Sequence, residues 1–146
     1  MIKKIFIYSI IAALTLYCVL DINKAKADEI AFLNIDEIMK NIDPAKFTKA
    51  QIKEYHKNIT GKQAKGEGVV VNVLPGKRDR HRVTILTPAS KPEKGYNVVL
   101  YTTMDAPSDL HLNDRILFEG EVGRLSTFRG ASVDIHGSYK KIGTEK

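Results

Sequence analysis

Two runs of alternating apolar and polar residues near the C-terminal end of the chain predict a β-hairpin. In residues 115–122 every second position is apolar or glycine, a period typical of a strand with one buried face. The residues expected on this buried face are Ile116, Phe118, Gly120 and Val122. The alternation returns after a glycine-bounded loop, with Ala131, Val133 and Ile135 expected inside and Ser132, Asp134 and His136 outside. We therefore expect the two runs to pair as antiparallel strands.

Three further strands are expected before this hairpin. Residues 68–74 are rich in valine and end at a Pro-Gly pair, and residues 82–88 alternate between an apolar and a polar face. These two runs predict a second hairpin. Residues 96–103 predict a third strand, after which Pro107 interrupts the pattern and residues 108–112 favour at most one helical turn.

Two short helices are expected ahead of the strands. In residues 28–41 and just beyond, the apolar positions recur at helical spacing: Ile35, Ile38, Met39 and Ile42. Thr48 and Gln51 have the spacing of a capping box, which predicts the start of a second helix that ends before Gly61. The face expected to be apolar in this helix comprises Ile52, Tyr55, His56 and Ile59. We interpret both apolar stripes as packing faces.

Residues 1–27 have the layout of a secretory signal peptide. Two lysines precede a short apolar run, and Ala25, Lys26 and Ala27 provide the small residues of a cleavage site. The run is shorter than the roughly 20 residues that a membrane-spanning helix needs. We expect cleavage after Ala27 and export to the periplasm or the outside; an uncleaved N-terminal anchor is the alternative. Lipid attachment at Cys18 is not expected, because the preceding Tyr17 is large.

The rest of the chain has the size and charge of one mildly basic domain. Of the 146 residues, those after position 27 are enough for one compact core. We divide them into a helical extension at 28–60, a barrel at 61–142 and a tail at 143–146. The formal net charge of +6 falls when the lysine-rich leader is removed, which permits an anionic partner without requiring one. Cys18 is the one cysteine, so no disulfide or thiol site is expected after cleavage.

The order of these elements resembles an OB-fold, the five-stranded Greek-key barrel. Gly61 and Lys62 lead into the glycine- and valine-rich residues 66–73, and residues 112–122 run from Leu112 through Asn-Asp and an apolar alternation to Gly-Glu-Val. The resemblance spans residues 60–142 and is strongest to the tRNA-anticodon-like branch found in small exported bacterial proteins, although Asn113 stands where glycine is common there. It implies a mainly β protein in which Gly66, Gly68 and Gly120 allow strands to bend.

The resemblance also implies where a ligand would bind. In an OB-fold, the loop between the first two strands and the loop between the last two flank the binding face. Both loops are basic here, and we expect them to converge at one edge. The candidate ligand-binding residues are Lys77, Arg78, Arg80, Arg82, Tyr101, Arg124, Phe128 and Arg129. Guanidinium groups suit phosphate or carboxylate, and Phe128 suits stacking. The alternative is that both loops are ordinary solvated turns.

Tyr101 joins this set through the alternation of the third strand. If Val98 and Leu100 point inward, Tyr101 points outward beside Arg82, where a base or a sugar ring could stack on it. A half-buried structural tyrosine is the alternative.

Catalytic and metal chemistry find little support in the sequence. Asp134 and His136 share a strand face, but no nucleophile can be placed beside them. His81, His111 and His136 lack the spacing of metal ligands, and we expect no cofactor. A barrel nuclease would need clustered carboxylates, and Asp79, Asp105, Asp109 and Asp114 cannot be assembled into such a cluster from sequence.

The sequence thus predicts an exported OB-fold binding module, not an enzyme, that holds an anionic ligand at its basic loops. The ligand would be a single-stranded nucleic acid or an acidic glycan. The alternative is an envelope protein-interaction or assembly subunit without a polymer ligand, and a hydrolase is the third hypothesis. The oligomeric state does not follow from the sequence.

Overall fold

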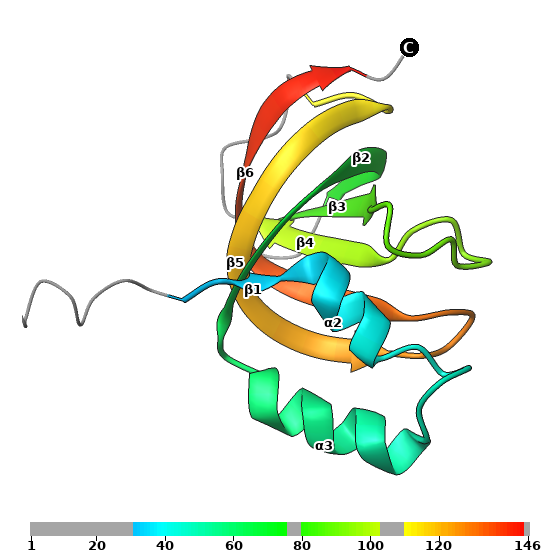
Figure 1. Ribbon diagram of the computed structural model, residues 1–146. Coiled ribbons are helices and arrows are strands. Elements are labelled where there is room, and N and C mark those ends of the chain that lie inside the picture. Colours follow the sequence, from blue (N-terminus) through cyan, green and yellow to red (C-terminus); the bar gives the residue numbers. More distant parts are fainter. Residues whose placement is uncertain (1–30, 76–79, 103–109, 145–146) are drawn as a thin grey trace, which may run out of the picture. The chain divides into compact units, whose positions relative to one another are not determined.

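The computed structural model describes residues 31–75, 80–102 and 110–144. The elements in chain order are β1 (Leu33–Asn34), α2 (Ile35–Asn41), α3 (Lys49–Ile59), β2 (Gln63–Pro75), β3 (His81–Leu86), β4 (Val98–Thr102), β5 (Asp114–Ser126) and β6 (Ser132–Thr144) (Figure 1). The signal peptide expected at 1–27, the basic residues Lys77 and Arg78, and the first two residues of the turn expected at 108–112 lie outside these residues. Among the helices that are described, none is long and apolar enough to cross a membrane.

Five strands close into an OB-fold barrel, as the sequence predicts. The strand order is β2-β3-β4-β6-β5, and β2 also pairs with β5 to close the ring. Only β4 and β6 run parallel within the ring; the other neighbours are antiparallel. Strand β2 serves two neighbours, because its first half pairs with β5 and its second half with β3. Figure 1 shows β5 and β6 curving together around the barrel.

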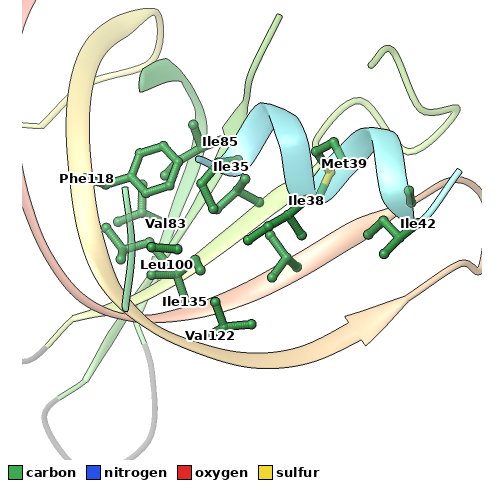
Figure 2. Packing of buried hydrophobic residues seen from close by; sticks show 14 of the residues in the cluster. Ile35, Ile38, Met39, Ile42, Val83, Ile85, Leu100, Phe118, Val122 and Ile135 are labelled. Atoms are coloured by element: carbon green, nitrogen blue, oxygen red, sulfur yellow. The ribbon is translucent and has the colours of Figure 1, made fainter. Parts of the chain in front are cut away.

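The alternating residues of the strands fill the barrel. Ile116, Phe118 and Val122 of β5 are at most 2% exposed, which confirms the predicted inner face of this strand. Their neighbours in the core come from β3, β4 and β6: Val83, Ile85, Val98, Leu100, Val133 and Ile135. Figure 2 shows Val83, Ile85, Leu100 and Ile135 of this set gathered inside the curved strands. Each fully buried aliphatic or aromatic side chain contributes roughly 1.5–3 kcal/mol to folding.

Helix α2 completes the core, although it precedes the barrel in sequence. Its residues Ile35, Ile38 and Met39 and the following Ile42 are at most 2% exposed, and Figure 2 shows them directed at the barrel interior. Gly66 of β2 permits this seating, since a Cβ atom there would lie 2.9 Å from Ile35 and 3.0 Å from Phe118. The helix is shorter than the predicted range of 28–41, because Leu33 and Asn34 pair with β2 instead.

Helix α3 has the predicted capping box and packs beside the end of β5. The Thr48 hydroxyl accepts a hydrogen bond from the Gln51 backbone, and the Gln51 side chain accepts one from the Thr48 backbone. Ile52 and Ile59 are buried, as predicted, and Gly61 follows the helix with a φ of 81°. The ring of His56 lies 3.0 Å from the Gly123 carbonyl oxygen, which attaches the helix to β5.

Strands β2 and β6 extend beyond their predicted limits, and one residue of β6 differs in burial. β2 begins at Gln63, not at residue 68, because its polar first residues form a ladder with β5. β6 continues to Thr144, into the expected tail, since Thr144 pairs with Asp114 at the start of β5. Ser132 was expected to face solvent but is 4% exposed, because its hydroxyl lies 2.6 Å from the Lys94 ammonium.

Asp114 joins the start of β5 to the end of β6. Its side chain is 1% exposed and accepts hydrogen bonds from Lys141 Nζ at 2.8 Å, the His111 backbone at 2.7 Å and the Thr144 hydroxyl at 2.8 Å. The Lys141 bond, with the His111 bond next in effect, lowers the pKa of Asp114 to about 2. We call this group of four residues the Asp114 corner.

Candidate binding face on strands β3, β4 and β6

The strand register places Arg82, Tyr101 and His136 side by side on the outside of the barrel. Arg82 of β3 pairs with Tyr101 of β4, and Tyr101 pairs with His136 of β6. Val98 and Leu100 are fully buried, so the alternation of β4 turns Tyr101 outward, beside Arg82 as predicted. We call the outward surface of β3, β4 and β6 the outer face.

Tyr101 and His136 stack their rings on this face. The ring centroids lie 5.1 Å apart with an interplanar angle of 15°. Tyr101 is half-buried and His136 exposed, so the pair presents a flat aromatic surface to solvent. Such a surface can accept another flat ring by stacking. The sequence placed His136 on the outside but gave no sign of this partner, because their contact depends on a register between distant strands.

Asp134 lies on the same face among basic side chains. Burial raises the pKa of its carboxyl group above the ordinary value. Four neighbouring side chains oppose that rise, in decreasing order Arg124, His136, Lys94 and Arg82. The nearest ion pair is loose, with Arg124 Nε 3.7 Å from Asp134 Oδ2. The carboxylate therefore organises a cluster of cations without binding any of them tightly.

Lys94 fixes the loop between β5 and β6. Its ammonium donates to the Ser132 hydroxyl at 2.6 Å, to the Gly130 carbonyl at 3.1 Å and to the Phe128 carbonyl at 3.4 Å. Burial lowers the pKa of Lys94, an effect that Asp134 partly opposes. This role of Lys94 could not be predicted from the sequence, because a single lysine in a loop carries no signal of such bonding.

The loop held by Lys94 exposes an aromatic ring and a guanidinium group. Phe128 is 74% exposed, and the Arg129 guanidinium carbon lies 5.6 Å from the centre of its ring. Arg129 has a positive φ of 53°, a left-handed backbone conformation that sets the direction of its Cα–Cβ bond. Both residues are accessible, as the sequence predicts for a hairpin tip.

The described residues that border the two basic loops lie at opposite ends of β4, whereas the sequence led us to expect both loops at one edge. The first loop ends at His81, which pairs with Thr102 at the C-terminal end of β4. The second loop leads into Val133, which pairs with Val98 at the N-terminal end of β4. Because β3 is antiparallel to β4 and β6 is parallel to it, His81 and Val133 lie at opposite ends of this strand.

The outer face nevertheless connects these two ends. Arg82 and Tyr101 lie near the C-terminal end of β4. Phe128 and Arg129 belong to the loop that leads into β6, whose first residues pair with the N-terminal end of β4. Asp134 lies between these ends, because it pairs with Val99 in the register of β4 and β6. Arg82 and Tyr101 thus lie on the outer face, and Arg124 lies beside it against Asp134. Lys77 and Arg78 lie outside the described residues.

A hollow of about 490 Å³ opens beside Tyr101. We call it the Tyr101 hollow. Its walls include Phe32, Gln63, Arg80, Tyr101, Glu119 and His136. Gly120, Gly137 and Ser138 complete the lining. Of the predicted site residues, Arg80 and Tyr101 are therefore brought together here. The sequence did not indicate the hollow, because its lining comes from separate segments.

The ionisable side chains of the outer face contact one another rather than forming a metal-ligand cluster among the described residues. Across residues 31–75, 80–102 and 110–144, no three histidine, cysteine, aspartate or glutamate side chains are grouped to hold a metal ion. The contact that the structure gives the His136 ring is the stack on Tyr101, and Asp134 is paired with Arg124. The arrangement combines rings and cations, which are groups that bind a ligand.

Comparison with known proteins shows similarity to solved structures alone. Neither a protein family nor a curated protein matches the chain. A chain of a replication protein A heterotrimer bound to single-stranded DNA is 16% identical, with a TM-score of 0.39; the match covers 56% of this chain and 57% of that one.

Two OBodies bound to hen egg-white lysozyme also match. One is 17% identical with a TM-score of 0.43, over 60% of this chain and 88% of the other. The second is 18% identical with a TM-score of 0.41, over 61% of this chain and 83% of the other. The fold assignment for this chain rests on its own strand order and barrel closure.

Proposed function

We propose that this protein is a non-enzymatic binding module that holds a single-stranded nucleic acid on its outer face. The observation that carries the proposal is the exposed stack of Tyr101 and His136 with Arg82 as its neighbour in the register. Flat rings accept bases of any sequence, and cations beside them bind the phosphates between the bases. This combination suits a single strand better than a duplex, whose bases are already stacked.

The charges on the outer face support a ligand with spaced negative groups. Arg82 of β3 and Arg124 of β5 both interact electrostatically with Asp134, so cations from two strands are available on this face. A phosphate that contacts either guanidinium would avoid this carboxylate. Binding of this kind releases counterions, so the affinity is expected to fall steeply with salt.

We also propose that binding takes place outside the cytoplasm, after removal of residues 1–27. The support is the leader-like sequence that ends in Ala25, Lys26 and Ala27. The intact mass of the native protein tests it: a chain that begins at Asp28 agrees with export, and a chain that retains Met1 contradicts cleavage.

Fluorescence anisotropy with a labelled thymidine decamer tests the binding proposal. Arg82→Glu is expected to weaken binding roughly tenfold at about 0.1 M salt, because it places a negative charge beside the ring stack. The matched control is Arg115→Glu, which makes the same charge change on β5, where Arg115 is ion-paired with Glu67. This control is expected to retain nearly the wild-type affinity.

Two results would contradict the proposal. If Arg115→Glu weakens binding as much as Arg82→Glu, the strand is held by net charge and not by the outer face. If the wild-type protein binds no strand at low salt, the nucleic-acid proposal fails. Binding to an acidic glycan such as polygalacturonate would then favour a glycan-binding module. Absence of binding to both would favour the assembly subunit.

A further inference from the structure

The Tyr101 hollow lies across β6, with a different charged group on each side. Arg80 immediately precedes β3 and approaches from the β4 side of β6, whereas Glu119 belongs to β5 on the other side. Gln63, at the start of β2, adds an amide group beyond β5. A ligand in the hollow would therefore meet a cation at one edge and an anion at another.

Two facing glycines give the hollow a flat floor. Gly120 of β5 pairs with Gly137 of β6 in the register, and a Cβ atom on either would collide with the backbone of the opposite strand. The two strands thus approach too closely here for any side chain. The bare backbone leaves room above it for a planar group.

The polar groups of the hollow are free to bind. Within the part of the chain that the structure describes, the side chains of Arg80, Glu119 and Gln63 make no hydrogen bond or ion pair. The rings of Phe32 and Tyr101 contribute apolar walls. A volume of about 490 Å³ is in the range that holds a small ligand, so one nucleotide fits.

We propose that the Tyr101 hollow selects a guanine base from the bound strand. The inference rests on the proposed function, since the strand on the outer face would deliver the base. Guanine has two acceptors, O6 and N7, that a guanidinium group can contact together. Its Watson–Crick edge carries two donors, N1–H and the N2 amino group, that a carboxylate can accept together.

The other bases match this pair of groups less well. Adenine offers an amino group but no second donor beside it, and cytosine presents its donor and its acceptors on the same edge. Thymine has a single donor between two acceptors. Only guanine satisfies Arg80 and Glu119 with paired contacts at the same time, which is why the charges of the hollow select it.

The experiment compares thymidine decamers that differ in one central nucleotide. Replacement of a thymidine by deoxyguanosine is expected to tighten binding to the wild-type protein about tenfold. Deoxyinosine lacks the N2 amino group and is expected to lose most of this gain. In Glu119→Gln the guanine and inosine strands are expected to bind alike.

Matched variants separate the hollow from its surroundings. Glu121→Gln makes the same charge change two positions along β5, outside the hollow, and is expected to keep the guanine preference. The wild-type protein is expected to bind a strand with 7-deazaguanine, which lacks N7, more weakly than the guanine strand. In Arg80→Gln this difference in affinity is expected to disappear. Melting temperatures confirm that each variant is folded.

The failure of this inference is distinguishable from failure of the proposed function. If the wild-type protein binds all decamers within about twofold of one another, the guanine inference is overturned and the outer-face proposal stands. The inference is also overturned if Glu121→Gln removes the preference as completely as Glu119→Gln. If no decamer binds, the proposed function and the inference both fail.

Discussion

Asp114 and Asp134 belong to the same hairpin of β5 and β6, yet their surroundings move their pKa values in opposite directions. Hydrogen bonds from Lys141 and from the His111 backbone lower the pKa of Asp114 to about 2. Burial raises the pKa of Asp134, and its nearest cation, Arg124, is 3.7 Å away. One carboxylate is enclosed by short hydrogen bonds, whereas the other has a single loose ion pair with Arg124.

The difference separates a structural part of the barrel from a binding part. In the Asp114 corner the carboxylate accepts hydrogen bonds from other residues of the protein, and these bonds join the start of β5 to the end of β6. On the outer face, the stacked rings and the exposed Arg124 guanidinium group are still open to a partner. Substitutions on the structural side should therefore change stability, and those on the outer face should change binding.

The largest expected effect concerns two phenylalanines on opposite sides of this division. Phe118 is 2% exposed inside the barrel, and Phe128 is 74% exposed at the loop tip. Phe118→Ala is expected to lower the free energy of unfolding by about 3–5 kcal/mol, because it leaves a cavity in the core. Phe128→Ala is expected to change it by less than about 0.5 kcal/mol. Urea denaturation measures both changes. Equal losses of stability would contradict the separation into a structural and a binding region.

The next effect concerns Tyr101, which should matter for binding more than for folding. Tyr101→Ala is expected to weaken single-strand binding by about 1–3 kcal/mol, because it removes a stacking surface. Asp114→Ala is expected to lower the melting temperature and to leave the affinity of the folded protein unchanged. Anisotropy and thermal unfolding on both variants test this. A loss of affinity in Asp114→Ala alone would reverse the assignment of the two regions.

The smallest effect is the pH dependence of stability, which should differ in sign between the two aspartates. The pKa of Asp114 is lowered, so its stabilisation is present above the ordinary value of 3.8 and is lost as the pH falls toward about 2. The pKa of Asp134 is raised, so its charged form opposes folding at neutral pH, and this cost disappears on acidification.

Urea denaturation of Asp114→Asn and Asp134→Asn across this acid range measures the two contributions. Asp114→Asn is expected to be less stable than the wild-type protein at neutral pH, with a difference that shrinks between pH 3.8 and about 2. Asp134→Asn is expected to be slightly more stable at neutral pH. A parallel loss of stability in both variants would show that Asp134 is as firmly bonded as Asp114.

The sequence predicted the barrel well, because alternation within a strand is a local property. Phe118 and Val122 were assigned to the core correctly, and so was the pairing of Tyr101 with Arg82. The first residues of β2 were missed since their polar side chains face solvent beside β5 and show no apolar period. The position of α2 inside the core was likewise hidden, because an apolar stripe does not say what covers it.

The candidate site was predicted in part, because its geometry depends on contacts between distant strands. Arg82, Tyr101 and Arg124 lie on or beside the outer face, but the described residues that border the two basic loops lie at opposite ends of β4. The stack on His136 comes from the parallel register of β4 and β6, which no local pattern encodes. Glu119 of the Tyr101 hollow looked like an ordinary outward residue of a strand.

The most direct test of the binding face is a map of the amide chemical shifts of the ¹⁵N-labelled protein during titration with a thymidine decamer. The largest changes are expected at Arg82, Tyr101 and His136, with the Asp114 corner nearly unchanged, because the strand would stack on the exposed rings. Changes concentrated at the Asp114 corner or on α3, or none at low salt, would contradict a binding face on β3, β4 and β6.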